Sequence, residues 1–257
     1  RQIHRRLPGI IDRRPARRQA PQPFLIDHRR SIPRTPCGPS FKSLHPAAGR
    51  RTLGAGRTAV SDEYARLVAR SWDAYHDGDA ETGVARAHAA AEVAPGDGRG
   101  YYAMACNLER LGALARADRA FMRAARAQHE PHPLPYRVGW RHFTGAVARA
   151  ADALPLELRE ALEEIDLILA DYPEGEHLDR DQGFELLGLF AGPTKAEAQE
   201  LAPGGELTTR IYLYRRAHEH IATSAGEFDE ELRRTLYHEL GHYLGFDEDD
   251  MEQFGLE

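Results

Sequence analysis

The most informative stretch of the chain is HELGHYLGFDEDD, residues 238–250, which lies close to the C-terminus. His238 and His242 are four residues apart, so on an α-helix their side chains leave the same face about one turn from each other. Two imidazole nitrogens at this spacing can bind one metal ion, and Glu239, one position further round, can reach a water molecule on that ion. The stretch therefore predicts a helix with two metal ligands and a carboxylate beside them.

The residues after the second histidine make the pattern more specific. Gly245 comes three positions later, where a residue in the left-handed conformation can end the helix and reverse the chain. Glu248 follows after three more, which completes HExxHxxGxxE, a pattern far rarer by chance than HExxH alone. Because only fifteen residues follow His242, we expect the third ligand in the turn after Gly245 or upstream of the helix. We predict that Glu248 is this ligand, with Asp247 and Asp249 as alternative ligands or supporting side chains.

From about residue 149 onward, the chain resembles the small bacterial zincin-like metallopeptidases that carry HExxHxxGxx(D/E). The resemblance rests on ALEEIDLILADYP (161–173), LLGLFAGP (186–193), IYLYRR (211–216) and TLYHELGHYLGFDEDD (235–250). It implies a minimal zincin fold, one zinc ion per chain and metal-dependent peptidase activity, but no particular substrate. Met251 is too close to the histidines to supply the later methionine turn of metzincins, and this departure argues against an ordinary metzincin.

Metal-assisted hydrolysis is the leading functional prediction. His238, His242 and Glu248 would hold one Zn²⁺, and Glu239 would be the general base that takes a proton from a zinc-bound water as it attacks a peptide carbonyl. The substrate would be a peptide or a protein. The alternative is a non-catalytic protein-interaction module with a structural or vestigial metal site.

Composition limits the other functional classes. No stretch of 18 apolar residues is present, so we expect no membrane-spanning helix. Cys37 and Cys106 are too few for a disulfide framework, which favours a reducing compartment and hence the cytoplasm. Residues 1–58 hold fourteen basic and two acidic residues, and the remainder holds 20 and 38, which gives charges of +12 and −18. An acidic body argues against nucleic acid as its partner.

Composition also divides the chain into three regions. Residues 1–58 are rich in arginine and contain half of the sixteen prolines, which predicts a disordered tail. Residues 59–130 are rich in alanine and repeat weakly at an offset of 34, at which Gly78 matches Gly112. This region is similar to tetratricopeptide repeats, so we expect a helical segment that binds a partner protein, or a plain helical support. Residues 131–257 form the zincin-like domain.

The zincin-like region predicts an α+β fold, with a small sheet packed on the active-site helix. Apolar periodicity and runs of apolar residues predict its elements. Helices are expected at 137–152 and 156–162, strands at 165–170, 184–190 and 209–216, a loop or short helix at 193–207, and the long helix from Phe228 to Gly245.

The strand at 209–216 is expected next to the active-site helix, at an edge of the sheet where an extended substrate can pair with it. Tyr212 and Tyr214 lie on the same side of this strand, and they are candidates for oxyanion or substrate contacts. Ordinary packing of strand aromatics is the alternative. His218 and His220 are predicted to be surface histidines of a helix, with a role as backup ligands or oxyanion partners as the alternative.

Overall fold

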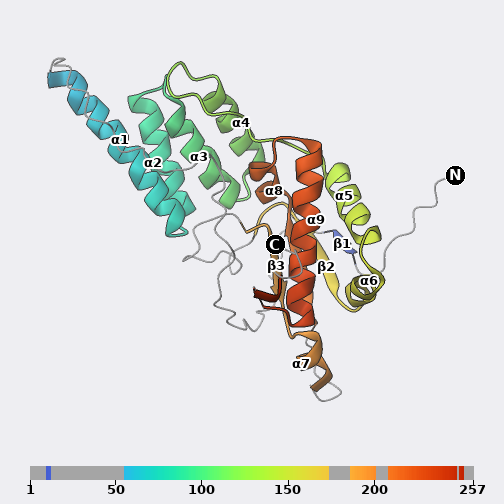
Figure 1. The fold of residues 1–257 in the computed structure, drawn as a ribbon. Coiled ribbons are helices and arrows are strands. Elements are labelled where there is room, and N and C mark those ends of the chain that lie inside the picture. Colours follow the sequence, from blue (N-terminus) through green and yellow to red (C-terminus); the bar gives the residue numbers. More distant parts are fainter. Residues whose placement is uncertain (1–9, 13–54, 174–185, 201–207, 248, 252–257) are drawn as a thin grey trace. The chain divides into compact units, whose positions relative to one another are not determined.

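The structure is a computed structural model that describes residues 10–12, 55–173, 186–200, 208–247 and 249–251. The described residues fall into two compact units (Figure 1). The helical unit contains those within residues 38–135 and 172–184, and the sheet unit contains those within residues 1–37, 136–171 and 185–257.

The helical unit is built from four consecutive helices. They are α1 (Ala55–His76), α2 (Ala80–Val93), α3 (Gly98–Arg110) and α4 (Leu114–Ala125). Each helix packs against the next one in the chain, and the short connections favour antiparallel hairpins. Gly78 and Gly112, which match in the sequence repeat, have positive φ angles of 76° and 65° and lie two residues after the ends of α1 and α3. The tetratricopeptide-like organisation of this region stays a prediction.

The sheet unit contains a mixed sheet and five helices among the described residues. The strands are β1 (Ile10–Asp12), β2 (Asp166–Ala170), β3 (Gly188–Ala191) and β4 (Arg210–Tyr214); the helices are α5 (Trp140–Asp152), α6 (Leu156–Glu163), α7 (Lys195–Glu200), α8 (Arg215–Ile221) and α9 (Ala225–Leu244). The strand order is β1-β2-β4-β3; β1, β2 and β4 are parallel, and β3 is antiparallel to β4. These elements confirm the predicted α+β fold class.

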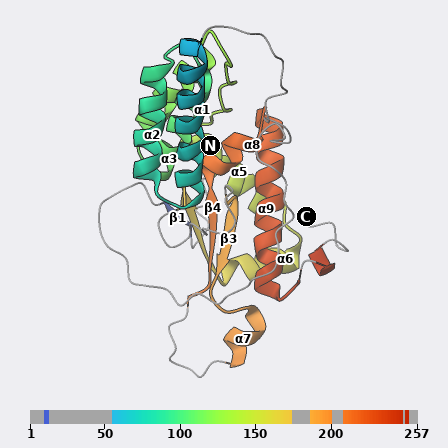
Figure 2. The same ribbon diagram turned by 90° about the vertical axis from the view of Figure 1, so that its left-hand side faces the viewer.

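Alternate residues of the central strands face two different apolar clusters. Ile211 and Leu213 of β4 pack in the larger cluster with Leu232, Leu236 and Leu240 of α9. The helix therefore covers one face of the sheet, where it lies alongside β3 and β4 (Figure 2). The alternate residues of β4, Tyr212 and Tyr214, belong to a smaller cluster on the other face.

Helix α9 has well-defined ends. At its start, the side chain of Ser224 accepts a hydrogen bond from the backbone of Glu227, and Glu227 reaches back to the N–H of Thr223. This cap starts the helix at Ala225, three residues before the predicted position. At its end, Gly245 has a φ of 91° and ends the helix in the left-handed conformation, as predicted.

Two further expectations differ from the structure. Residues Ile10–Asp12, within the predicted disordered tail, pair with Leu167–Leu169 as strand β1, because the outer side of β2 offers unpaired backbone groups. The strand predicted at the edge, β4, instead lies between β2 and β3, so β3 is the edge strand on that side of the described sheet. Among the helices that the structure describes, none combines the length and hydrophobicity that a membrane crossing requires.

Candidate metal centre and active site

The two predicted histidine ligands converge on α9. The Nε2 atoms of His238 and His242 are 3.0 Å apart, and the two rings are nearly perpendicular. A tetrahedral zinc ion bound at about 2.0–2.1 Å from each nitrogen would hold them about 3.3 Å apart. His238 is buried and His242 is half-buried. The pair therefore fits a single metal ion in both chemistry and spacing.

Among the residues that the structure describes, no group of three or more His, Cys, Asp or Glu side chains is gathered closely enough to hold a metal ion, so the third ligand stays a prediction. Glu248, the predicted ligand, lies outside the described residues. Asp247 and Asp249 are exposed. The carboxylate of Asp247 accepts a hydrogen bond from the N–H of Asp250 at 3.0 Å, and that of Asp250 accepts one from Asp247 at 3.3 Å. Asp247 thus acts as a helix cap.

The turn after Gly245 folds back onto the helix that carries the histidines. The N–H of Phe246 donates to the carbonyl of Gly241 at 3.0 Å, and Met251 is fully buried. A Cβ atom placed on residue 241 would lie 2.5 Å from Sδ of Met251. A side chain at position 241 would force Met251 to shift, so Gly241, which lies between the two histidines in the sequence, forms a notch that receives Met251.

The predicted general base lies against the edge strand. Glu239 is buried, and a Cβ atom on Gly188 would be 2.8 Å from its Oε1 and 2.9 Å from its Cγ. The same Cβ would be 2.6 Å from Cγ2 of Thr235, one turn earlier on α9. Strand β3 can approach Glu239 this closely because residue 188 is glycine. The sequence signal that could have located this contact is the glycine inside the apolar run FELLGLF, since glycine within a strand marks close backbone approach.

The backbone N–H and C=O groups of Gly188 also face the outer edge of the described sheet. The N–H of Tyr214 donates to the carbonyl of Leu187 at 3.0 Å, so residue 187 is a hydrogen-bonded position of the antiparallel pair. Hydrogen-bonded and non-bonded positions alternate along such a pair. The backbone N–H and C=O groups of Gly188 and Phe190 therefore point away from β4. The outward backbone groups of the edge strand of the described sheet and the carboxylate of Glu239 therefore meet at Gly188.

The two tyrosines proposed for oxyanion or substrate contacts lie elsewhere. Tyr212 and Tyr214 are buried with Ile168 and Ala217 in the smaller cluster, on the face of the sheet opposite α9. Their rings stack with centroids 6.3 Å apart. The structure does not bring them to the histidines, because Ile211 and Leu213 occupy the side of β4 that faces the helix.

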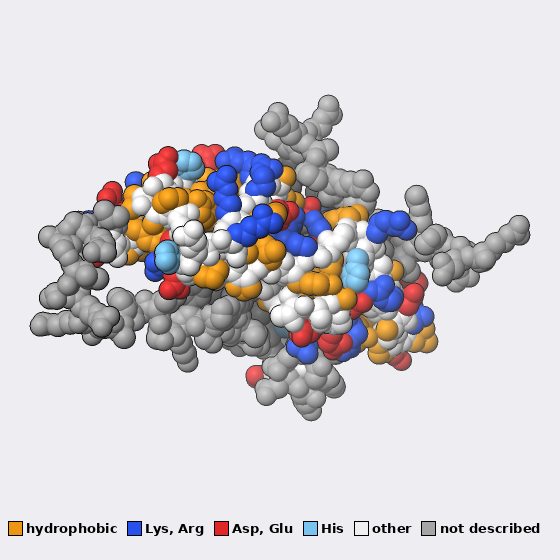
Figure 3. All heavy atoms as spheres, turned by 90° about the horizontal axis from the view of Figure 1, so that it is seen from above, with side chains coloured by type: hydrophobic (Ala, Val, Ile, Leu, Met, Phe, Trp, Pro, Cys, Tyr) orange, Lys and Arg blue, Asp and Glu red, His pale blue; other side chains and the backbone are white. Residues whose placement is uncertain are grey.

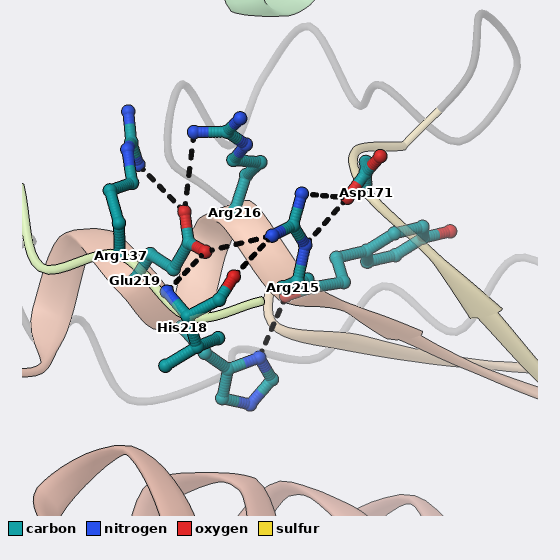
Figure 4. Close-up of polar contacts among 8 residues, drawn as sticks. Arg137, Asp171, Arg215, Arg216, His218 and Glu219 are labelled. Atoms are coloured by element: carbon teal, nitrogen blue, oxygen red, sulfur yellow. Dashed lines mark hydrogen bonds and ion pairs between the residues drawn. The ribbon is translucent and has the colours of Figure 1, made fainter. Parts of the chain in front are cut away.

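Helix α8 is fixed by a buried ionic network that was not predicted from the sequence (Figure 4). Glu219 is fully buried, and its carboxylate accepts from Arg137 at 2.8 Å and lies 3.3 Å from both Arg215 and Arg216. Arg215 also pairs with Asp171, just after β2. Burial raises the pKa of the Glu219 carboxyl, and the arginines offset part of that rise. The network ties α8 to the start of α5 and the end of β2.

A helix with two converging histidines and an adjacent glutamate, packed beside an antiparallel edge strand, is the arrangement expected of a zincin-like metallopeptidase. The model of the family described as zincin-like metallopeptidase matches residues 162–256, a range that includes strands β2, β3 and β4 and helix α9. The match covers less than half of the chain; it supports the zincin-like family and a zinc-dependent peptidase for this part of it. No curated protein matches the chain.

Proposed function

We propose that the chain is a zinc-dependent peptidase whose active site lies where the C-terminal half of α9 meets β3. The observation that carries the proposal is the 3.0 Å separation of the Nε2 atoms of His238 and His242. Both histidines, together with Glu248, would hold the ion. Zinc bound there supplies Lewis acidity, which polarises a substrate carbonyl and lowers the pKa of water to about 7.

In this proposal Glu239 is the general base. It follows His238 directly on α9, and its carboxylate lies against Gly188. It takes a proton from the attacking water and returns a proton to the leaving amine, which requires one carboxylate to reach both atoms. Its buried position limits access by bulk water on the side of the helix.

Strand β3 replaces β4 as the proposed binding strand for an extended peptide. The outward N–H and C=O groups of Gly188 and Phe190 can pair with a peptide backbone, which adds one strand to the sheet. Main-chain pairing of this kind recognises a peptide by its backbone, so it suits a broad class of sequences. A peptide held there has its carbonyl groups next to Glu239.

The packing of the turn supports Glu248 as the third ligand. The residues on both sides of it, Asp247 and Asp249, belong to a segment that Met251 fixes in the notch of Gly241. Because Gly241 directly precedes His242 on α9, this packing fixes Met251 against the turn of the helix that carries the second histidine. Asp247 is engaged as a cap, which makes it the weaker alternative.

Metal analysis together with activity tests the proposal. Purified wild type should contain about one zinc ion per chain and should cleave a peptide mixture in a chelator-sensitive manner. His238→Ala and Glu248→Ala should each lose zinc, whereas Glu239→Gln should keep zinc and lose turnover. Retention of zinc by Glu248→Ala would reassign the third ligand, and unchanged turnover in Glu239→Gln would refute the proposed base.

The second candidate function is the binding of a partner protein by the helical unit. Figure 3 shows basic side chains exposed on the surface of the described residues. Within the helical unit, α4 and its C-terminal cap carry four exposed arginines at intervals of three or four residues, which places them on one stripe: Arg116, Arg119, Arg123 and Arg126. In the described part of the chain none of the four is paired with a carboxylate. The stripe fits an acidic segment of a partner protein.

Binding of a fluorescent acidic peptide tests this second candidate. Replacement of the four arginines of the stripe by glutamine should weaken binding at least tenfold, and salt should weaken binding to the wild type. The matched control replaces Arg66 and Arg70, two exposed arginines of α1, in the same way and should bind as the wild type does. Equal loss in both variants would show a general charge effect and no docking site.

A further inference from the structure

His218 lies on α8, between the ionic network and the active-site helix. It was predicted to be a surface residue, but its side chain is fully buried. Its Nδ1 lies 2.8 Å from the carbonyl oxygen of Tyr214, and its Nε2 lies 3.1 Å from Oγ1 of Thr235 on α9. Its ring lies on the side of α8 away from the carboxylate of Glu219 (Figure 4). His218 therefore links a fixed helix to the helix that carries the candidate site.

These contacts define the proton positions. A backbone carbonyl only accepts, so Nδ1 of His218 carries the hydrogen and donates it to Tyr214. Burial lowers the pKa of His218 to about 4, so the ring is neutral at pH 7 and Nε2 is an acceptor. The Thr235 hydroxyl has one hydrogen and two acceptors within reach: the carbonyl oxygen of Glu231 at 2.9 Å and Nε2 of His218 at 3.1 Å.

The hydrogen bond fixes which group of Thr235 faces the site. With Oγ1 held at His218, the methyl group Cγ2 points to the space beside Gly188, where Oε1 of Glu239 also lies. Threonine in a helix has two accessible χ1 rotamers, because its hydroxyl can bond to carbonyls of the preceding turn in either of them. His218 selects one of the two.

We propose that His218 is a positioning residue that holds the hydroxyl of Thr235 away from Glu239, so that a methyl group faces the carboxylate. The inference rests on the proposed role of Glu239 as general base. Without the acceptor at His218 the hydroxyl keeps only the Glu231 carbonyl, and in its other rotamer it can donate a hydrogen bond to the carboxylate. That bond would occupy the oxygen that must take a proton and would pull the side chain from its place beside Gly188. The network around Glu219 contributes by keeping α8, and hence His218, in position.

A double-mutant comparison tests the inference. His218→Phe keeps an aromatic ring but has no acceptor, and it should lower kcat at least tenfold, with KM and zinc content unchanged. Thr235→Val keeps the methyl group and removes the hydroxyl, so it should retain kcat within about threefold. The double variant should recover the kcat of Thr235→Val, because no hydroxyl remains to turn. A merely structural role of His218 predicts no recovery, and that result would overturn the inference.

A measurement without turnover separates this inference from the proposed function. In wild-type protein, NMR should show His218 protonated on Nδ1 and a nuclear Overhauser effect between the Thr235 methyl group and the α-protons of Gly188. In His218→Phe this effect should weaken. Absence of the effect in wild type, or an unchanged effect in the variant, would overturn the inference even if the enzyme is active. If wild type shows no zinc-dependent turnover, the proposed function fails, and the NMR comparison alone decides the positioning role.

Discussion

Replacement of Gly188 by alanine is the sharpest perturbation that the structure offers. The new methyl group would lie 2.6 Å from Cγ2 of Thr235 and 2.8 Å from Oε1 of Glu239. Ordinary contact begins at 3.4 Å, so both neighbours would have to give way. Thr235 is fixed on a helix, whereas the end of Glu239 can rotate. Either β3 moves away from α9 or the carboxylate turns away from the strand, and both separate the proposed base from the proposed binding strand.

The magnitudes follow from this geometry. Inserting a methyl group into a tightly packed site costs about 1–3 kcal/mol of unfolding free energy. A displacement of about 1 Å at a catalytic group lowers the rate on the order of 100-fold. The three atoms nearest to the added methyl group belong to Thr235 and Glu239 and to neither histidine, so we expect zinc affinity to change little. Gly188→Ala should therefore lose about 10- to 100-fold in kcat/KM while it retains its zinc.

The assay is chelator-sensitive cleavage of a peptide mixture, with zinc content and urea unfolding measured on the same samples. Gly226→Ala is the matched control, because Gly226 lies on α9 and a Cβ atom there meets nothing within 4 Å. The control should keep full activity and stability. Wild-type turnover in Gly188→Ala would refute the proposed contact between β3 and Glu239, and an equal loss in Gly226→Ala would show that the effect is not local.

Three further predictions concern the metal site and the fold. Gly241→Ala should weaken zinc binding, measured by chelator competition, and lower the unfolding free energy of the apo-protein by about 1–3 kcal/mol, measured by thermal unfolding. Adding Met251→Ala should relieve part of both losses, and independent effects of the two changes would contradict the notch. Glu219→Gln should lower the unfolding free energy, measured in urea, by about 3–5 kcal/mol because three guanidinium groups lose their buried counter-charge. The control Glu230→Gln, at an exposed pair, should lower it by under about 1 kcal/mol, and similar losses in the two variants would refute the network. Burial lowers the pKa of His218 to about 4 in the folded state, so the unfolded chain takes up the proton first as the pH falls. The contribution of the neutral ring to the unfolding free energy should be complete above about pH 6.5 and fall by up to about 3 kcal/mol as the pH drops to 4. In urea titrations His218→Phe should lose this part of the pH dependence.

Features that depend on neighbours along the chain were predictable from sequence. The convergence of His238 and His242 follows from helical geometry alone, because residues four apart share a face. The end of α9 at Gly245 follows from the conformational freedom of glycine, and its observed φ is positive. The start was missed because the cap at Ser224 lies outside the apolar periodicity that defined the helix.

Features that depend on distant contacts were not predictable in the same way. The face of β4 toward α9 could not be chosen, because the residues from Ile211 to Tyr214 are all buried and both sides of the strand read as apolar. Strand order is likewise non-local, so the edge position was given to β4 when it belongs to β3. His218 looked exposed because its burial comes from α9 and not from its own short helix.

The two glycines at the site support different parts of it, so the positioning of the base and the support of the metal can be tested separately. Gly188 admits a strand to the side of α9 that carries Glu239, whereas Gly241 admits Met251 and hence the turn that follows the histidines. A methyl group at the first position disturbs the base and the peptide edge; at the second it disturbs the support of the metal. If Gly188→Ala loses turnover with zinc retained, and Gly241→Ala loses zinc in proportion to turnover, then the base and the metal are positioned independently. Loss of both properties in both variants would mean that α9 responds as a single rigid element to any contact on its surface.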